Sequence, residues 1–218
     1  MNLSKKNIVQ RENDKILKKF TEELDFYTEY FFYQEYAYSP FISNLYEYKY
    51  NLLILEYING KNLYELLNEG SEISDIKIFI SSLAHSLKQL HEKTYNYETN
   101  TCLIHKDTNI KNYLFKDKIV YIIDFSDIEI NHPFCDIFSV SLFLCEIFSQ
   151  TDFEKIINTF LNSYNSDMVF KCHQPQQILK DEIARFDLRR KSLAKNIDTN
   201  NVININRAYL LQISYTMF

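Results

Sequence analysis

Glycine is the residue type that this sequence most clearly lacks, since its 218 residues include only two, Gly60 and Gly70. Glycine-rich loops let backbone amides approach phosphates closely, so a nucleotide site in this chain has to hold phosphate by other means. Tryptophan is absent too, whereas tyrosine and phenylalanine occur 17 times each. With 46% hydrophobic and 24% charged residues, the chain nevertheless has the composition of a compact globular protein.

A surplus of basic residues is also missing, because 29 aspartates and glutamates outnumber 24 lysines and arginines and give a net charge of −5. Proteins that bind mainly nucleic acid need a basic surface that displaces counterions from the phosphate backbone. We therefore expect no nucleic-acid partner. The four cysteines show no CxxC spacing, which indicates reduced thiols and a cytoplasmic location rather than a disulfide framework.

Long apolar segments are missing as well. The longest apolar stretch, 134–148, contains Asp136 and Glu146 and is too short to span a bilayer. Residues 1–14 carry charges without an apolar core, which is not the pattern of a signal peptide. We therefore expect neither secretion nor a membrane span.

The pattern of apolar residues predicts an α+β protein, with a small β-rich part followed by a larger helical part. The expected strands are 8–11, 15–20, 45–48, 52–57, 113–115 and 119–123. The expected helices are 21–38, 74–90, 136–148, 152–164 and 177–194. Thr21 and Ser74 are typical N-cap residues for the first two helices. The Asn59-Gly60 break predicts a division into two lobes, 1–58 and 59–218.

One stretch combines residues that suit phosphoryl transfer. It contains His105 and Asp107 in a His-x-Asp pattern, then Asn112, then a hairpin that ends at Asp124 and Phe125. Phosphoryl transfer needs oxygen ligands that hold Mg²⁺ against the phosphates and a further carboxylate that faces the attacking hydroxyl. The stretch resembles the catalytic loop and metal-binding motif of the protein-kinase-like superfamily. The resemblance implies that Asp107 accepts or orients the hydroxyl proton, that Asn112 and Asp124 bind magnesium, and that His105 packs the loop.

The first lobe contains residues that match the same superfamily. Lys18 resembles the phosphate-binding lysine of a central strand, and strand alternation turns Lys19 to the opposite face. Glu29 precedes Pro40 at a spacing similar to that between the lysine's glutamate partner and a turn proline in this superfamily. Such a pair would fix Lys18 against the α- and β-phosphates of ATP. Other glutamates that could take this role are Glu22, Glu23 and Glu35.

The segment 53–60 resembles the hinge between the two lobes of a kinase. The resemblance implies that backbone groups of Glu56 and Ile58 face the adenine edge. An apolar slot for the purine is then expected from Ile16, Leu55, Leu114 and Ile123. The same four residues would also suit an ordinary hydrophobic core, so they discriminate little between the two interpretations.

The interval from Asp124 to Asp136 is too short for the activation segment of a protein kinase. In this it resembles the aminoglycoside and choline phosphotransferase group and the small bacterial sugar or lipopolysaccharide (Kdo-type) kinases. Asn109 agrees, because protein kinases usually carry a lysine at that position. The resemblance implies that Asp136 braces the catalytic loop from below, although a simple helix N-cap would explain it equally well.

The resemblance implies a two-lobed, protein-kinase-like fold and an ATP- and Mg²⁺-dependent phosphotransferase, or kinase. The expected acceptor is a hydroxyl group of a small molecule, namely a sugar, a glycolipid or an amino alcohol. The missing glycines and Ser126, which replaces the glycine usual after Asp-Phe, leave a pseudokinase scaffold or binding module as an alternative. A minimal protein Ser/Thr kinase is a further alternative.

The acceptor is the least defined part of this hypothesis. The net negative charge suits a cationic acceptor. The last expected helix, however, is rich in basic residues, which could contact an anionic lipid surface or form a solvated face. These residues are Lys180, Arg185, Arg189, Arg190, Lys191 and Lys195. No feature of the sequence defines an oligomeric state.

Overall fold

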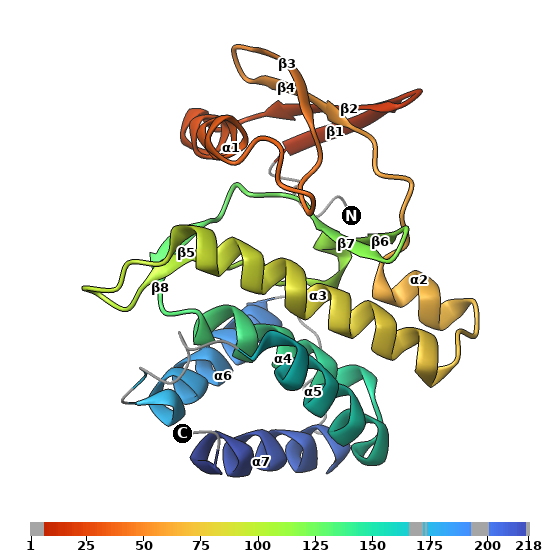
Figure 1. Ribbon diagram of the computed structural model, residues 1–218, viewed down its shortest axis with the longest axis vertical. Coiled ribbons are helices and arrows are strands. Elements are labelled where there is room, and N and C mark those ends of the chain that lie inside the picture. Colours follow the sequence, from red (N-terminus) through yellow and green to blue (C-terminus); the bar gives the residue numbers. More distant parts are fainter. Residues whose placement is uncertain (1–6, 166–171, 173, 193–200, 217–218) are drawn as a thin grey trace.

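The structure is a computed structural model that describes residues 7–165, 172, 174–192 and 201–216 of the chain. A sheet with one helix lies at one end of the molecule and most of the helices lie at the other (Figure 1). The α+β class predicted from the sequence is confirmed. The lobe boundary at residues 58 and 59 stays a prediction.

Four antiparallel strands form the sheet in the order β1-β2-β4-β3. Their bounds are β1 Asn7–Glu12, β2 Lys15–Phe20, β3 Leu45–Lys49 and β4 Leu52–Glu56. Alternation along β2 buries Lys18 and Phe20 and exposes Lys19. Lys18 pairs with Leu53 of β4 in the strand register, which places it in the middle of the sheet.

Helix α1 (Glu23–Glu35) packs on this sheet through aromatic residues. The Phe26 ring lies 5.7 Å from that of Phe20, and the Tyr30 ring lies 4.4 Å from that of Tyr48. The expected N-cap at Thr21 is wrong, because the helix begins after Glu22 without a side-chain cap bond. Two glutamates and an aspartate at the start of this helix favour its N-terminus electrostatically without such a cap.

The segment after β4 crosses close to the β6–β7 hairpin. Lys61 exchanges backbone hydrogen bonds with Phe115 at 2.8 and 3.0 Å. A Cβ atom added at Gly60 would lie 2.9 Å from the Phe115 carbonyl oxygen, so glycine is the residue that permits this approach. Helix α2 (Leu63–Asn68) follows and begins at a capping box of Asn62 and Glu65. This helix was not predicted, because its six residues are too few for a clear periodic pattern.

Helix α3 (Ile73–Thr94) is a long helix that packs against β7, and its predicted apolar face is buried. It begins at Ile73 after Glu72, so the expected cap at Ser74 is wrong, and Ser74 lies in the first turn. The next elements are β5 Cys102–Ile104, η1 Ile110–Asn112, β6 Tyr113–Lys116, β7 Ile119–Ile122 and β8 Glu129–Asn131. The three-residue strands β5 and β8, which pair with each other, were not predicted because they are too short to show alternation.

Four helices complete the described part of the chain: α4 Phe134–Ile147, α5 Gln150–Tyr164, α6 Pro175–Ser192 and α7 Asn201–Thr216. The first three correspond to predicted helices, although the expected end of the third, 193–194, lies outside the described residues. Helix α4 is buried on nearly all sides and is covered by α6 and α7. None of the described helices is both long and apolar enough to cross a membrane.

Candidate active site

Lys18 is the centre of a buried cluster of charges. Its Nζ lies 2.5 Å from Oε2 of Glu29 on α1 and 2.6 Å from Oδ1 of Asp124, which follows β7. Lys18 is 5% exposed and Glu29 is fully buried, whereas the side chain of Asp124 is 40% exposed. The structure thus joins three of the residues that the sequence singled out for nucleotide and metal binding. Among the hydrogen bonds and ion pairs of the described residues, none joins Lys18 to Glu22, Glu23 or Glu35.

The cluster perturbs the protonation of its members. Burial would lower the pKa of Lys18, but the charges of Glu29 and Asp124 outweigh burial and raise it above the ordinary value. Burial raises the pKa of Glu29 to about 7, against the attraction of Lys18. Burial would likewise raise the pKa of Asp124, but the Lys18 ammonium and the Ser126 hydroxyl lower it below its usual range. Asp124 therefore stays ionised and is the carboxylate that can bind a cation.

Backbone strain marks the same position. Asp124 has a φ angle of 66°, in the left-handed region that an aspartate seldom adopts. The Ser126 hydroxyl donates to Asp124 Oδ1 at 3.0 Å. The next residue, Phe125, is fully buried and stacks on Phe32 of α1 with 3.8 Å between the ring centres. This stack ties the Asp-Phe segment to the helix that carries Glu29.

Asp136 holds the loop that carries Asp107. Its Oδ2 and Oδ1 accept hydrogen bonds from the backbone amides of His105 at 2.6 Å and Lys106 at 2.9 Å. The His91 ring lies 3.1 Å from Oδ2 and contacts Tyr164 on its other side at 2.7 Å. Asp136 lies within the first turn of α4, whose N-cap position is Pro133, so the simple N-cap alternative is wrong and the bracing role is confirmed.

His105 packs the same loop from inside. Its side chain is fully buried, and Nε2 donates to the Ile123 carbonyl at 3.0 Å. Its ring lies 5.4 Å from the Phe125 ring and 5.7 Å from the Tyr113 ring. This contact joins the loop to the segment just before Asp124, which confirms the packing role expected of His105.

Asp107 lies at the surface of the loop, with a side chain that is 33% exposed. Its Oδ2 and its carbonyl oxygen accept hydrogen bonds from Nδ2 of Asn112 at 3.0 and 2.9 Å. The Asn112 carbonyl accepts from the Ile123 amide at 3.0 Å, which keeps Asn112 beside Asp124. Asn109, which replaces the protein-kinase lysine, caps η1 by accepting from the Lys111 amide.

A cavity of about 190 Å³ opens between the sheet and the hairpin below it. All ten residues expected to bind nucleotide or metal line this cavity: Ile16, Lys18, Glu29, Leu55, Glu56, Ile58, Asn112, Leu114, Ile123 and Asp124. Asp107 is not among the lining residues but bonds to Asn112, which is. The roles of these residues in binding are proposals.

Four further residues line the cavity and were not predicted: Val9, Tyr33, Ser43 and Tyr57. Two of them carried a signal in the sequence. Tyr33 lies one helical turn after Glu29 on α1, and Tyr57 lies between the two predicted hinge positions. Val9 is opposite Lys18 in the β1–β2 register, which only the observed pairing reveals. Ser43 lies in irregular backbone, for which the sequence gives no pattern.

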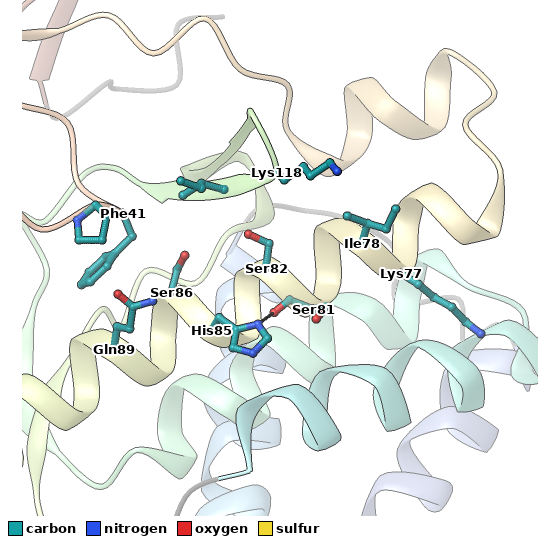
Figure 2. A pocket seen from close by; sticks show the side chains of 11 residues that line it. Phe41, Lys77, Ile78, Ser81, Ser82, His85, Ser86, Gln89 and Lys118 are labelled. Carbon is teal, nitrogen blue, oxygen red and sulfur yellow. Dashed lines mark hydrogen bonds between the residues drawn. The ribbon is translucent and has the colours of Figure 1, made fainter.

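A larger cavity of about 500 Å³ lies elsewhere, along α3 and the β6–β7 hairpin (Figure 2). Its polar lining includes Ser82, which accepts from the Val120 amide, and Ser86, which donates to the Val120 carbonyl. These hydroxyls therefore serve the packing of α3 on the hairpin. The lining contains no carboxylate and none of the residues predicted for phosphoryl transfer, so the smaller cavity is the candidate site.

The donors in the smaller cavity suit magnesium. Mg²⁺ binds oxygen, and with nucleotides it typically uses one or two protein ligands, while phosphates and water complete its shell. Asp124 is ionised and faces the cavity. Asn112 donates from Nδ2 to Asp107, so the Oδ1 atom of Asn112 can bind a metal. Among the described residues no group of three acidic, histidine or cysteine side chains could hold a metal ion.

The chain has clear similarity to known phosphotransferases. The model of the family described as phosphotransferase enzyme family matches residues 76–170, which include Asp107, Asn112 and Asp124. A search of curated proteins finds no significant match. The ADP-bound aminoglycoside phosphotransferase APH(2'')-Ib aligns with a TM-score of 0.57 and 14% identity, covering 94% of this chain and 92% of that one.

Two further solved structures show the same fold. The Plasmodium vivax ethanolamine kinase aligns with a TM-score of 0.56 and 12% identity over 98% of this chain and 82% of its own. A choline/ethanolamine kinase family protein from Mesorhizobium loti aligns with a TM-score of 0.55 and 11% identity over 97% and 84%. The family match and the shared fold support a kinase-type phosphotransferase. The chain thus has the protein-kinase-like fold, and the resemblance to the aminoglycoside and choline phosphotransferase group that its motifs suggested is confirmed.

Proposed function

We propose that this protein transfers the γ-phosphoryl group of ATP to a hydroxyl group of a small molecule. One observation carries the proposal: Lys18 contacts both Glu29 and Asp124, while Asn112 connects the Asp124 side of the cavity to Asp107. The Lys18 ammonium and the ionised Asp124 therefore line one cavity, and the partly exposed carboxylate of Asp107 is joined to it through Asn112. This is the arrangement that positions a triphosphate against a hydroxyl.

The apolar part of the cavity suits a purine. Its lining includes four apolar side chains, Ile16, Leu55, Leu114 and Ile123, and two residues of the segment that resembles the hinge, Glu56 and Ile58. The Glu56 amide donates to the Asn44 carbonyl at 2.8 Å, so its carbonyl is the group that it can present to an adenine. In our proposal the Ile58 amide supplies the complementary donor. These contacts would orient the nucleotide so that its phosphates point toward Lys18.

The charged part of the cavity suits the phosphates. We expect a bound triphosphate to replace the direct Lys18–Asp124 contact, so that Lys18, still held by Glu29, binds the α- and β-phosphates. Asp124 and Asn112 would hold a magnesium ion, which when bound supplies positive charge against the phosphate oxygens. No glycine precedes Gly60, so the lysine and the metal ligands carry more of the phosphate contact than in a site with a glycine-rich loop.

Asp107 is the proposed general base. In the transfer, the acceptor oxygen forms a bond to the γ-phosphorus while the bond from that phosphorus to the β–γ bridging oxygen breaks and ADP leaves. The proton of the acceptor hydroxyl passes to Asp107. Asn112 holds Oδ2 of Asp107, so Oδ1 is free of Asn112 and can face the acceptor. Because ATP is abundant in the cytoplasm, the proposal includes a cytoplasmic location.

A transfer assay tests this function. The protein would be incubated with γ-labelled ATP and Mg²⁺ against sugars, amino alcohols, lipid extracts and proteins, with Asp124→Ala as the control. We expect label in a small hydroxylated compound and none with Asp124→Ala. Label confined to peptides or to the protein itself would instead indicate a protein kinase. No label, together with no Mg²⁺-dependent thermal shift by ATP, would indicate a pseudokinase scaffold.

A further inference from the structure

Helix α1 is apolar on both of its faces, although the described part of the chain buries only one of them. Phe26 and Phe32 are buried on the inner face. On the outer face, Leu24 and Phe31 are 76% and 61% exposed, and Tyr27 is exposed as well. A helix that is apolar all round is normally buried all round, so this outer face indicates a contact with another molecule.

Leu24, Tyr27 and Phe31, here called the α1 stripe, follow the spacing of a helix that docks in a groove. They lie at positions i, i+3 and i+7, and the Tyr27 and Phe31 rings stack with their centres 5.9 Å apart. The exposed carboxylates of Glu23 and Glu35 mark the two ends of the helix, which contains no basic residue. The stripe therefore fits a partner surface that is apolar and basic.

The larger cavity, of about 500 Å³, is such a surface. Figure 2 shows it as a groove between α3 and the β6–β7 hairpin, here called the α3 groove. Its apolar lining includes the exposed side chains of Ile78 and Ile119 and the buried ring of Phe41. The hydroxyls of Ser82 and Ser86 already bond to the hairpin, so the groove offers mainly apolar contact.

The lysines that line the α3 groove are Lys77 and Lys118, and no carboxylate lines it. Neither lysine forms an ion pair or a side-chain hydrogen bond within the part of the chain that the structure describes. Lys93 lies beyond the other end of the groove, where it donates to the Ser39 hydroxyl at 2.8 Å and lies 5.8 Å from the centre of the Phe41 ring. The groove is therefore basic at both ends, although the chain has a net charge of −5.

The α1 stripe and the α3 groove also match in length. Glu23 and Glu35 are twelve positions apart on α1, as are Lys77 and Gln89, the first and last lining residues on α3. At about 1.5 Å per residue, both spans are about 18 Å. One chain thus carries an acidic apolar helix face and a basic apolar groove of the same length. A second copy of the chain is therefore the occupant that both surfaces fit.

We propose that the α1 stripe of one copy docks in the α3 groove of a second copy, so that the protein associates head to tail. The two surfaces belong to different elements, so the contact is heterologous and each copy can contact two others in an open chain or a ring. Two α1 stripes do not suit each other, because both ends of the helix are acidic and repel in either orientation. One helix face in one groove is a small interface, so we expect micromolar or weaker affinity. The proposal does not depend on the proposed phosphotransferase function.

The basic helix α6 is a different kind of surface. Arg185 pairs with Glu182 on the same helix. The contact of α6 with an anionic lipid that the sequence suggested stays a prediction, because Lys195 and the side chains of Arg190 and Lys191 lie outside the described residues.

Analytical ultracentrifugation of the full chain, from about 1 µM to about 1 mM, tests the proposed contact. We expect the average mass to rise with concentration past that of a dimer. Phe31→Ser removes an aromatic anchor from the α1 stripe, and Lys77→Glu combined with Lys118→Glu reverses the charge of the α3 groove. Each of these proteins alone should associate at least about 10-fold more weakly than the unmodified protein.

Mixing the two variants gives the sharpest result. Phe31→Ser keeps its groove, and the Lys77→Glu, Lys118→Glu protein keeps its stripe, so an equal mixture should form a dimer and nothing larger. A symmetric dimer through either surface alone would not be restored by mixing. An unmodified protein that stays monomeric over the whole range would overturn the proposal. A mixture that forms no dimer, or a variant that associates as well as the unmodified protein, would overturn it too.

Two control variants exclude general stickiness and net charge. Ile130→Ser removes an exposed apolar side chain from β8, and Lys19→Glu combined with Lys180→Glu makes the same change in net charge at exposed positions elsewhere. Both should associate as the unmodified protein does, and loss of association in either would overturn the proposal. Circular dichroism checks that each variant is folded, and Leu24→Ser replaces Phe31→Ser on the same stripe if that variant is not.

Discussion

The two halves of the candidate site are built differently. On the nucleotide side, Lys18 and Glu29 are buried and lie 2.5 Å apart inside a sheet and helix. On the proposed acceptor side, Asp107 and Arg189 are 33% and 46% exposed and 3.8 Å apart. The buried half is assembled before any ligand arrives, which suits one constant ligand. The exposed half can open, which suits an acceptor that must enter, react and leave.

The difference has an energetic consequence. Removing one partner of a buried ion pair leaves the other charge without compensation, whereas an exposed pair is largely screened by water. The nucleotide side therefore couples binding to stability, and the acceptor side does not. Substitutions on the two sides should separate these effects.

Lys18→Met should have the largest effect on stability. It leaves fully buried Glu29 without its cation, so we expect the free energy of unfolding to fall by about 3–5 kcal/mol. Urea denaturation followed by circular dichroism would measure the change. Mg-ATP binding should be lost at temperatures where the variant is still folded.

Two controls sharpen this comparison. Lys19→Met removes the same charge one residue along β2, where the side chain is exposed, and should change stability by less than about 0.5 kcal/mol. Arg189→Met on the acceptor side should cost less than about 1 kcal/mol. A Lys18→Met variant as stable as Lys19→Met would contradict the idea of a preassembled, charge-coupled nucleotide side.

The pH dependence of stability should show a smaller effect from Glu29. Its pKa is 4.5 ordinarily and about 7 in the folded protein, so between these values the folded state keeps a proton that the unfolded chain releases. The resulting stabilisation is complete below pH 4.5 and is lost as the pH rises through 7. Asp124 and Asp136 have pKa values below the ordinary 3.8, so they stabilise the folded protein when ionised. That stabilisation is lost only as the pH falls below 3.8.

His132, whose pKa burial lowers to about 4, also changes stability between pH 5 and pH 8, so comparison with a variant that lacks only the Glu29 carboxyl isolates Glu29. Relative to Glu29→Gln, which cannot titrate, the unmodified protein should lose up to about 3 kcal/mol of unfolding free energy across this window. Parallel urea titrations at both pH values would measure the difference. Identical pH profiles of the two proteins would show that burial does not raise the pKa of Glu29.

Much of the nucleotide side could be predicted from the sequence, because its determinants are local or periodic. Strand alternation predicted that Lys18 rather than Lys19 faces the site. A short motif predicted that Asp107, Asn112 and Asp124 lie together on one loop and the hairpin that follows it. The structure confirms their proximity. The pairing of Lys18 with Glu29 could be predicted only by family resemblance, since several glutamates lie near the start of that helix.

The acceptor side could not be predicted in the same way. Arg189 lies far from Asp107 in the sequence, and only the packing of α6 on α4 brings the two together. In the sequence it was one of several basic residues in a helix, and nothing local distinguished it. The expected caps at Thr21 and Ser74 were wrong for a related reason, because propensity identifies residues that can cap a helix but tertiary packing determines where the helix begins.

The most direct test of the central claim is a paired measurement on Asp107→Asn, of Mg-ATP affinity by calorimetry and of transfer to the acceptor found in the labelling assay. Because Asp107 does not line the nucleotide cavity, we predict an affinity close to that of the unmodified protein and a transfer rate lower by about 10²- to 10⁴-fold. Full transfer activity in Asp107→Asn would contradict the assignment of the base. Loss of Mg-ATP binding in this variant would contradict the division of the site into a nucleotide side and an acceptor side.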